Sequence, residues 1–301
     1  MRRLAIITLS LLAAGVSFAQ KSGFSEDTLL LQIWLDRMNL SAGSIDGVWG
    51  GKTEVAFRLW QHENNLPQTG KISPEIREQF DTNILFTVYT VTQEDHQDLT
   101  VIPTVWPEKA LLPKMNYETV QEKVAERFHA SPKGLARLNP HVPDWPNPCA
   151  GTQLRVPDVE GVALEHAARL VIYLGRFELA AYDKENRLIA LFPVSIAKEQ
   201  AKRPSGEITI NTIIPDPNYL YDPVLFGDPP SNGKKIIQPG PNNPVGRVWF
   251  GLSLQGYGIH GSPHPETIGR AESKGCFRLS NWNAVKLMHM VQPGTPVKIE
   301  D

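Results

Sequence analysis

Apolar residues recur with a helical period in two stretches near the start of the chain. The first stretch carries Leu29, Leu30, Ile33, Trp34 and Leu35, and the second carries Val55, Ala56, Leu59 and Trp60. This 3.6-residue spacing predicts two amphipathic helices. Thr53 is the expected N-cap of the second, and Ser73-Pro74 predicts the start of a third, short helix. The pattern therefore predicts a small three-helix bundle over residues 25–82.

A second region, residues 115–160, mixes two short helical patterns with one strand. A helix is expected near residues 124–129, and Ser131-Pro132 opens another that ends at Asn139-Pro140. Residues 151–157 then read as a short strand. The preceding residues 83–114 contain Ile102-Pro103 and Trp106-Pro107, which favour an extended linker or an accessory strand pair.

From residue 161 to residue 301 the apolar pattern changes to short β-type runs divided by Pro and Gly. Strands are expected at residues 170–174, 176–182, 188–195, 208–214, 247–254 and 295–299. The turn at residues 183–186 joins the strand at 176–182 to the strand at 188–195 in a hairpin. Only residues 282–290 read as a helix. The prediction is a β-rich, sandwich-like or barrel-like domain. The whole chain is then a multi-domain α+β protein.

The first 19 residues have the pattern of a secretory signal peptide. Met1-Arg2-Arg3 precedes an apolar run to Phe18, and Ser17-Phe18-Ala19 places small residues before an expected cleavage at Gln20. A retained membrane anchor is the alternative. No later segment is apolar enough to cross a bilayer. We therefore expect an exported, periplasmic protein with no membrane span in its mature form.

The net charge and the small number of cysteines limit the kinds of ligand and reaction that the chain can be expected to serve. The formal net charge is −2 and no Lys/Arg stripe is present, which argues against nucleic-acid or electrostatic membrane binding. No cluster of metal-ligating residues and no phosphate-binding glycine loop appears, so no cofactor and no metal is implied. Cys149 and Cys276 are the two cysteines. They fall in different expected modules, and a disulfide between them would remove Cys276 as a nucleophile.

Cys276 is the candidate nucleophile. It lies between Lys274 and Arg278, whose charges favour a thiolate. A cysteine nucleophile also needs a base, usually histidine. Of the eight histidines, His260 fits best because it follows an expected strand and precedes a glycine, where the backbone can turn sharply. Cys149, in a proline-rich loop, reads as structural or incidental.

The segment around these residues resembles the signature of the L,D-transpeptidase catalytic domain. Tyr257-Gly-Ile-His-Gly-Ser262 is followed, at the spacing of that family, by Ser273-Lys-Gly-Cys-Phe-Arg-Leu-Ser-Asn281. The sequence departs from the family at Lys274, where a histidine is common. This departure leaves open how the pKa of the thiol is set.

The resemblance implies roles for several residues. Cys276 would form a thioester with a peptidoglycan tetrapeptide stem, and His260 would transfer the proton. The Gly261 carbonyl would orient His260, and the backbone N–H groups at Gly275 and Cys276 would hold the oxyanion. The expected substrate-binding residues are Arg278, Tyr257, Ser273 and Lys274. For Arg278 an internal salt bridge is an equal alternative to binding a stem-peptide carboxylate.

The acceptor would be an amine, either of a second stem (a 3–3 cross-link) or of a lysine on an outer-membrane protein. A hydrolase or carboxypeptidase using the same thioester, and a non-catalytic wall-binding protein, are the alternatives.

The other two modules also resemble families of the cell wall. Ile45-Asp46-Gly47-Val48-Trp49-Gly50 and Thr53 are similar to the loop of the peptidoglycan-binding helical domain. Residues 115–160 resemble a lysin-motif unit through Asn139-Pro140 and Val156-Pro157. The expected partners are peptidoglycan stem peptides and glycan, while the second module serves either as a glycan binder or as a spacer.

Overall fold

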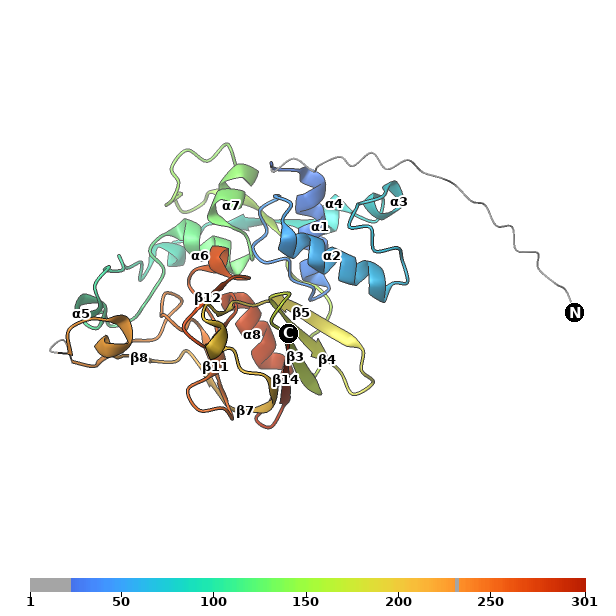
Figure 1. Ribbon diagram of the computed structural model, residues 1–301. Coiled ribbons are helices and arrows are strands. Elements are labelled where there is room, and N and C mark those ends of the chain that lie inside the picture. The colour runs from blue at the N-terminus through green and yellow to red at the C-terminus, as the bar shows by residue number, and fades with distance from the viewer. Residues whose placement is uncertain (1–22, 231–232) are drawn as a thin grey trace, which may run out of the picture.

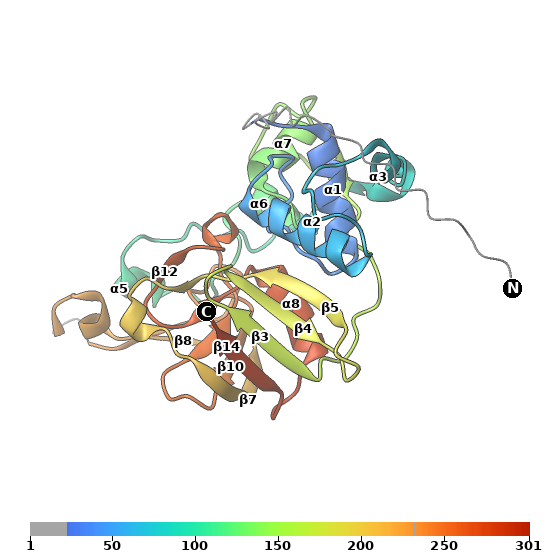
Figure 2. The same ribbon diagram turned by 45° about the vertical axis from the view of Figure 1, so that its right-hand side comes forward.

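The structure is a computed structural model that describes residues 23–230 and 233–301; the expected signal peptide lies outside these residues. Figures 1 and 2 show most helices of the first half of the chain gathered on one side and a β-rich domain on the other. None of the helices in the described ranges is long and apolar enough to span a membrane.

The first module is the predicted helical bundle. Its helices are α1 (Glu26–Arg37), α2 (Gly51–Glu63), α3 (Pro74–Arg77) and α4 (Thr82–Leu85). Ser73 caps α3 as predicted, with Pro74 in its first turn. The prediction for Thr53 was wrong, because α2 begins at Gly51 with Gly50 as its N-cap. The Thr53 hydroxyl instead accepts a hydrogen bond from Gln32 Nε2 at 3.2 Å, which ties α2 to α1.

The second module begins earlier than the sequence indicated. Its elements are β1 (Phe86–Thr90), η1 (Glu94–His96), α5 (Trp106–Lys109), α6 (Val120–Arg127), α7 (Pro132–Leu138) and β2 (Gln153–Pro157). β1 pairs antiparallel with β2, Phe86 opposite Pro157. Residues 83–114 are therefore not a free linker, since they supply the strand that pairs with β2. The partner strand lies far away along the chain, so local patterning does not reveal the pairing.

The third module contains an eight-stranded sheet of order β13-β11-β10-β7-β14-β3-β4-β5. Its strands in chain order are β3 (Arg169–Tyr173), β4 (Glu178–Tyr182), β5 (Leu188–Pro193), β7 (Gly206–Pro215), β10 (Val248–Leu252), β11 (Gly258–His260), β13 (Phe277–Arg278) and β14 (Pro296–Glu300). Helix α8 (Asn281–Met290) packs Ala284, Leu287 and Met290 into the core of this sheet. The strands and the helix predicted from the sequence are all present.

Two smaller strand pairs flank this sheet. β6 (Ile196–Ala197) pairs in parallel with β12 (Ala271–Ser273), and β8 (Tyr219–Tyr221) pairs antiparallel with β9 (Lys235–Ile237). The short 3₁₀ helices are η2 (Gln200–Lys202), η3 (Pro223–Phe226) and η5 (Pro265–Thr267). We call residues 219–228 and 235–237 the flap.

The second module packs on the flap. The Trp106 ring stacks on Tyr221 with centroids 4.6 Å apart and lies 4.9 Å from the Phe226 ring. The backbone of Met115 also bonds to the third module, with Met115 N donating to Pro239 O at 2.8 Å. The segment expected to be a linker therefore supports a part of the third module.

All three modules meet at one buried carboxylate. Asp36 of α1 is 1% exposed and accepts hydrogen bonds from His129 Nδ1 at 2.8 Å and Lys286 Nζ at 3.0 Å. Burial disfavours the charged form of Asp36, but the charges and hydrogen bonds of His129 and Lys286 outweigh it, so the pKa of Asp36 lies below its usual value. Nearby, Ser41 N donates to Leu191 O of β5, and Ile45 N donates to His129 O, each at 2.8 Å.

Replacing Asp36 with alanine should strongly destabilise the assembled chain. Removing one partner of a buried ion pair leaves His129 and Lys286 without their acceptor, a loss of about 3–5 kcal/mol. Urea unfolding at pH 7 measures this loss in the free energy of unfolding. Because the folded-state pKa of Asp36 is lowered, its contribution is complete above the ordinary carboxyl value near 4 and is lost only as pH falls below that value.

Asp27→Ala on the same helix is the matched control. Asp27 pairs with Arg77 at the surface, so its loss should cost less than about 1 kcal/mol. Equal destabilisation by the two substitutions would contradict the role of Asp36.

Candidate active site

Cys276 and His260 lie on neighbouring strands of the large sheet. β11 and β13 run parallel, with Ile259 opposite Phe277 and His260 opposite Arg278. Cys276 directly precedes β13, so it lies level with Gly258. Neighbouring strands are about 4.8 Å apart and side chains alternate between faces. The register therefore places Cys276, Arg278 and His260 on one face of the sheet.

The opposite face of the same strands is core. Ile259 and Phe277 are 0% and 1% exposed, and they pack with the residues of α8. Alternation thus divides each strand into a buried apolar set and a set that faces the site. The site residues are held by a packed core directly behind them.

His260 has a defined tautomer. Its Nδ1 lies 2.6 Å from the carbonyl oxygen of Gly261. A carbonyl oxygen only accepts, so Nδ1 carries the hydrogen and Nε2 keeps its lone pair. The ring also stacks on Trp249, with centroids 5.7 Å apart. The hydrogen bond to the Gly261 carbonyl is the one expected from the sequence, and it leaves Nε2 as a proton acceptor.

Burial keeps both members of the pair neutral. It lowers the pKa of His260 to about 4; the hydrogen bond to Gly261 opposes this shift and the Arg278 charge adds to it. Burial also raises the pKa of the Cys276 thiol, against the smaller influence of the Gly258 N–H and Arg278. For the thiol, burial thus opposes the effect that the flanking cations were expected to have on its pKa.

Lys274 does not act on the sulfur. Its Nζ donates to Leu225 O at 2.7 Å and lies 3.5 Å from the centroid of the Phe226 ring. Both partners belong to the flap. Lys274, at the position where a family histidine is common, thus joins the nucleophile loop to the flap. The flap also brings Tyr219 near the thiol: burial raises the pKa of Tyr219, and the charge of Cys276 adds to this.

Ser273 and Gly275 shape the turn before the nucleophile. Ser273 Oγ donates to Cys276 O at 2.6 Å and accepts from Gly275 N at 3.3 Å. The Gly275 N–H is therefore engaged, whereas the Cys276 N–H bonds to no acceptor in the described part of the chain. Of the two expected oxyanion donors, only the Cys276 N–H is available in this conformation.

The remaining predicted substrate-binding residues have protein partners. Arg278 Nη2 lies 3.2 Å from Glu272 Oε1, the internal salt bridge that the sequence left as one alternative. Its Nε is buried and unpaired within residues 23–230 and 233–301. Tyr257 donates its hydroxyl hydrogen to Lys202 O at 3.0 Å. The structure thus brings Tyr257, Ser273 and Arg278 to the site, with Arg278 Nε still able to donate.

The sequence did not identify Trp249, Tyr219 and Gly258 as neighbours of the candidate nucleophile and base. Trp249 lies opposite His260 in the β10–β11 register. Nothing in the local sequence signals such cross-strand neighbours. Cys149 is a free, exposed cysteine, and Cys276 is also free. No group of three or more His, Cys, Asp or Glu side chains able to hold a metal ion occurs in the described residues.

Comparison with known proteins supports this description. Residues 167–299 match the family described as L,D-transpeptidase catalytic domain, and residues 25–79 match the putative peptidoglycan binding domain. The chain is 28% identical over 178 residues to the putative L,D-transpeptidase YkuD of Bacillus licheniformis, covering 59% of this chain and 92% of that protein. It is 32% identical over 114 residues to the protein of that name in Bacillus subtilis, covering 38% of this chain and 55% of that protein.

A solved structure of the L,D-transpeptidase from Xylanimonas cellulosilytica is 16% identical, with a TM-score of 0.40 and coverage of 95% of this chain and 99% of that chain. By these sequence matches, residues 167–299 are similar to L,D-transpeptidase catalytic domains and residues 25–79 to putative peptidoglycan-binding domains.

Proposed function

We propose that this chain is an exported, periplasmic enzyme that acylates Cys276 with a peptidoglycan stem peptide and transfers the acyl group to an amine. The observation that carries the proposal is the shared face of β11 and β13. There a half-buried thiol and an imidazole with a free Nε2 lie on adjacent strands beside the unengaged Cys276 N–H.

The chemistry begins from a neutral pair. As Cys276 Sγ attacks the acyl carbon of the stem, His260 Nε2 takes the thiol proton. The Cys276 N–H donates to the developing oxyanion. The C–N bond then breaks, His260 returns the proton to the departing amine, and a thioester remains.

The acceptor decides the second step. An incoming amine attacks the thioester, gives a proton to His260 and releases the Cys276 thiol. An amine of a second stem gives a cross-link, and a protein lysine gives an attached protein. Water in the same position gives a trimmed stem.

Arg278 and the flap are suited to hold the donor stem. Among the described residues, Arg278 Nε is a buried donor without an acceptor, and a substrate carboxylate would satisfy it. The flap covers the nucleophile loop through Lys274. The neighbouring peptidoglycan-binding domain would keep the enzyme on its polymer.

Incubation with a synthetic tetrapeptide stem should add the mass of the acyl group to the intact protein. Cys276→Ala should abolish this adduct, because no other thiol lies beside an imidazole on this sheet. Cys149→Ser is the matched control and should acylate normally, since Cys149 is exposed and remote from His260. Intact-protein mass spectrometry gives the result. An adduct that persists in the Cys276→Ala variant would refute the assignment.

The rate of acylation should keep its value well below pH 6.5. The general base works as the neutral imidazole, and the pKa of His260 is lowered to about 4, so the acid limb of kcat/KM should fall near pH 4. In the Cys149→Ser background, alkylation of Cys276 by iodoacetamide should rise only above the ordinary thiol pKa, because burial raises it. An acid limb near pH 6.5, together with rapid alkylation at neutral pH, would instead indicate a resting thiolate–imidazolium pair.

A further inference from the structure

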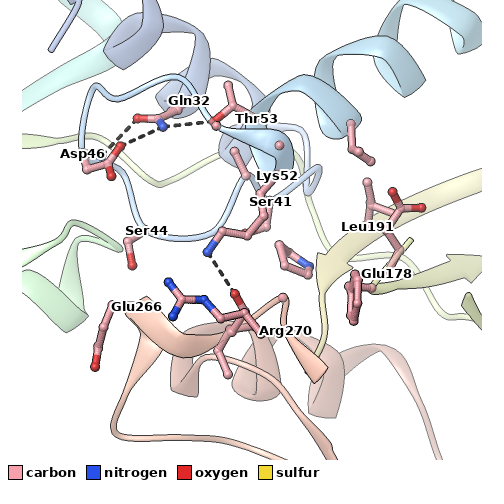
Figure 3. Close-up of a pocket in the computed structure, with 18 of the residues that line it drawn as sticks. Gln32, Ser41, Ser44, Asp46, Lys52, Thr53, Glu178, Leu191, Glu266 and Arg270 are labelled. Atoms are coloured by element: carbon pink, nitrogen blue, oxygen red, sulfur yellow. Dashed lines mark hydrogen bonds between the residues drawn. The ribbon is translucent and has the colours of Figure 1, made fainter. Parts of the chain in front are cut away.

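A cavity of about 680 Å³ lies between the peptidoglycan-binding domain and the catalytic domain. One wall is the loop from Ser41 and the first turns of α2, and the other is formed by residues 175–178 and 266–270 (Figure 3). Its volume falls within the range of small-molecule binding sites, about 300–1,000 Å³. The cavity is separate from the face that carries Cys276 and His260, and none of its lining residues belongs to that face.

Three cations line the cavity: Lys52 comes from the first module, and Arg176 and Arg270 come from the third. Lys52 of α2 donates to Ile268 O at 3.0 Å across the domain boundary. The guanidinium of Arg270 makes no hydrogen bond and no ion pair with any described residue, and it extends toward Ser44 and Glu266 (Figure 3). An exposed guanidinium beside a cavity is a ready donor for a carboxylate.

Two buried polar groups of the lining lack partners. Glu178 is 5% exposed; its Oε2 lies 3.2 Å from Arg176 Nε, but its Oε1 has no partner within the described ranges. The Ser44 hydroxyl is likewise buried without a partner there. Buried polar atoms are normally hydrogen-bonded, so each of these atoms would be stabilised by a polar partner. Burial raises the pKa of Glu178, and a ligand ammonium beside it would offset that shift.

The cavity wall is connected to the nucleophile. Residues 266–270 lead directly into β12 and from there to Cys276. Ser195 Oγ accepts from Gly269 N at 3.1 Å and donates to Thr267 O at 3.1 Å, while its backbone exchanges two 2.9 Å hydrogen bonds with Arg278. The loop that borders the cavity is thus fixed to the strand that carries the active-site arginine.

We propose that this cavity is a second binding site, for an acidic peptide that carries a free amine, with its carboxylates at Lys52 and Arg270 and its amine at Glu178. The proposal rests on the proposed function, because stem peptides that contain a diamino acid have this chemistry. The site would hold one strand of wall polymer across both domains while another part of the polymer occupies the Cys276 site.

Arg270→Gln should weaken binding of a diaminopimelate-containing tetrapeptide by at least about tenfold, the loss of a charge-assisted hydrogen bond. Isothermal titration of the full chain carrying Cys276→Ala measures this without turnover. The fold should not change, because the guanidinium has no protein partner among the described residues. Lys71→Gln, which removes one exposed cation of the first module outside the cavity, is the control for the loss of a positive charge. Unchanged affinity in the Arg270→Gln variant would overturn the site.

Acetylating the peptide's free amine tests the other end of the cavity. Acetylation should weaken binding to the parent protein several-fold, and Glu178→Gln should remove that difference. A difference that survives Glu178→Gln would overturn the placement of the amine. A tetramer of N-acetylglucosamine, which has neither charge, should bind without dependence on Arg270; a tenfold loss for this sugar would overturn the ligand class.

Acylation of the parent protein separates the two proposals. A Cys276 adduct together with Arg270-independent peptide binding refutes only the cavity site. Arg270-dependent binding without any adduct refutes only the proposed catalysis.

Discussion

The buried carboxylate of Asp36 is the contact on which the arrangement of the whole chain depends. It comes from the first module, and its two hydrogen-bond donors, His129 and Lys286, come from the second module and from helix α8 of the third. A charge removed from water is tolerated only when it is paired and hydrogen-bonded, so the three modules must be assembled for Asp36 to be stable. The core packing agrees, since Ala180 and Leu191 of the catalytic sheet belong to the apolar cluster of the helical module.

This assembly has consequences for the catalytic site. The flap rests on Trp106 from the second module on one side and on Lys274 from the nucleophile loop on the other. A segment far from Cys276 in sequence therefore positions the cover beside the thiol. The inter-domain cavity arises from the same assembly, because Lys52 of its lining comes from one domain and Arg270 from the other.

Burial governs the electrostatics of the site. Burial shifts the half-buried thiol and the buried imidazole toward their neutral forms; the charge of Arg278 opposes this shift for the thiol and adds to it for the imidazole. The Gly261 carbonyl holds the hydrogen on Nδ1 and leaves Nε2 as the acceptor that the proposed reaction requires.

The sequence by itself determined the main helices, the longer strands of the large sheet and the similarity to two families, because periodicity and the spacing around Cys276 are local properties. It could not determine that β1 pairs with β2, that Trp249 stacks on His260, or that Lys274 turns toward the flap, since these depend on partners distant along the chain. Residue type suggested a thiolate between two cations. Only the tertiary structure showed that desolvation outweighs those charges, because burial is set by the packing of the whole chain around the site.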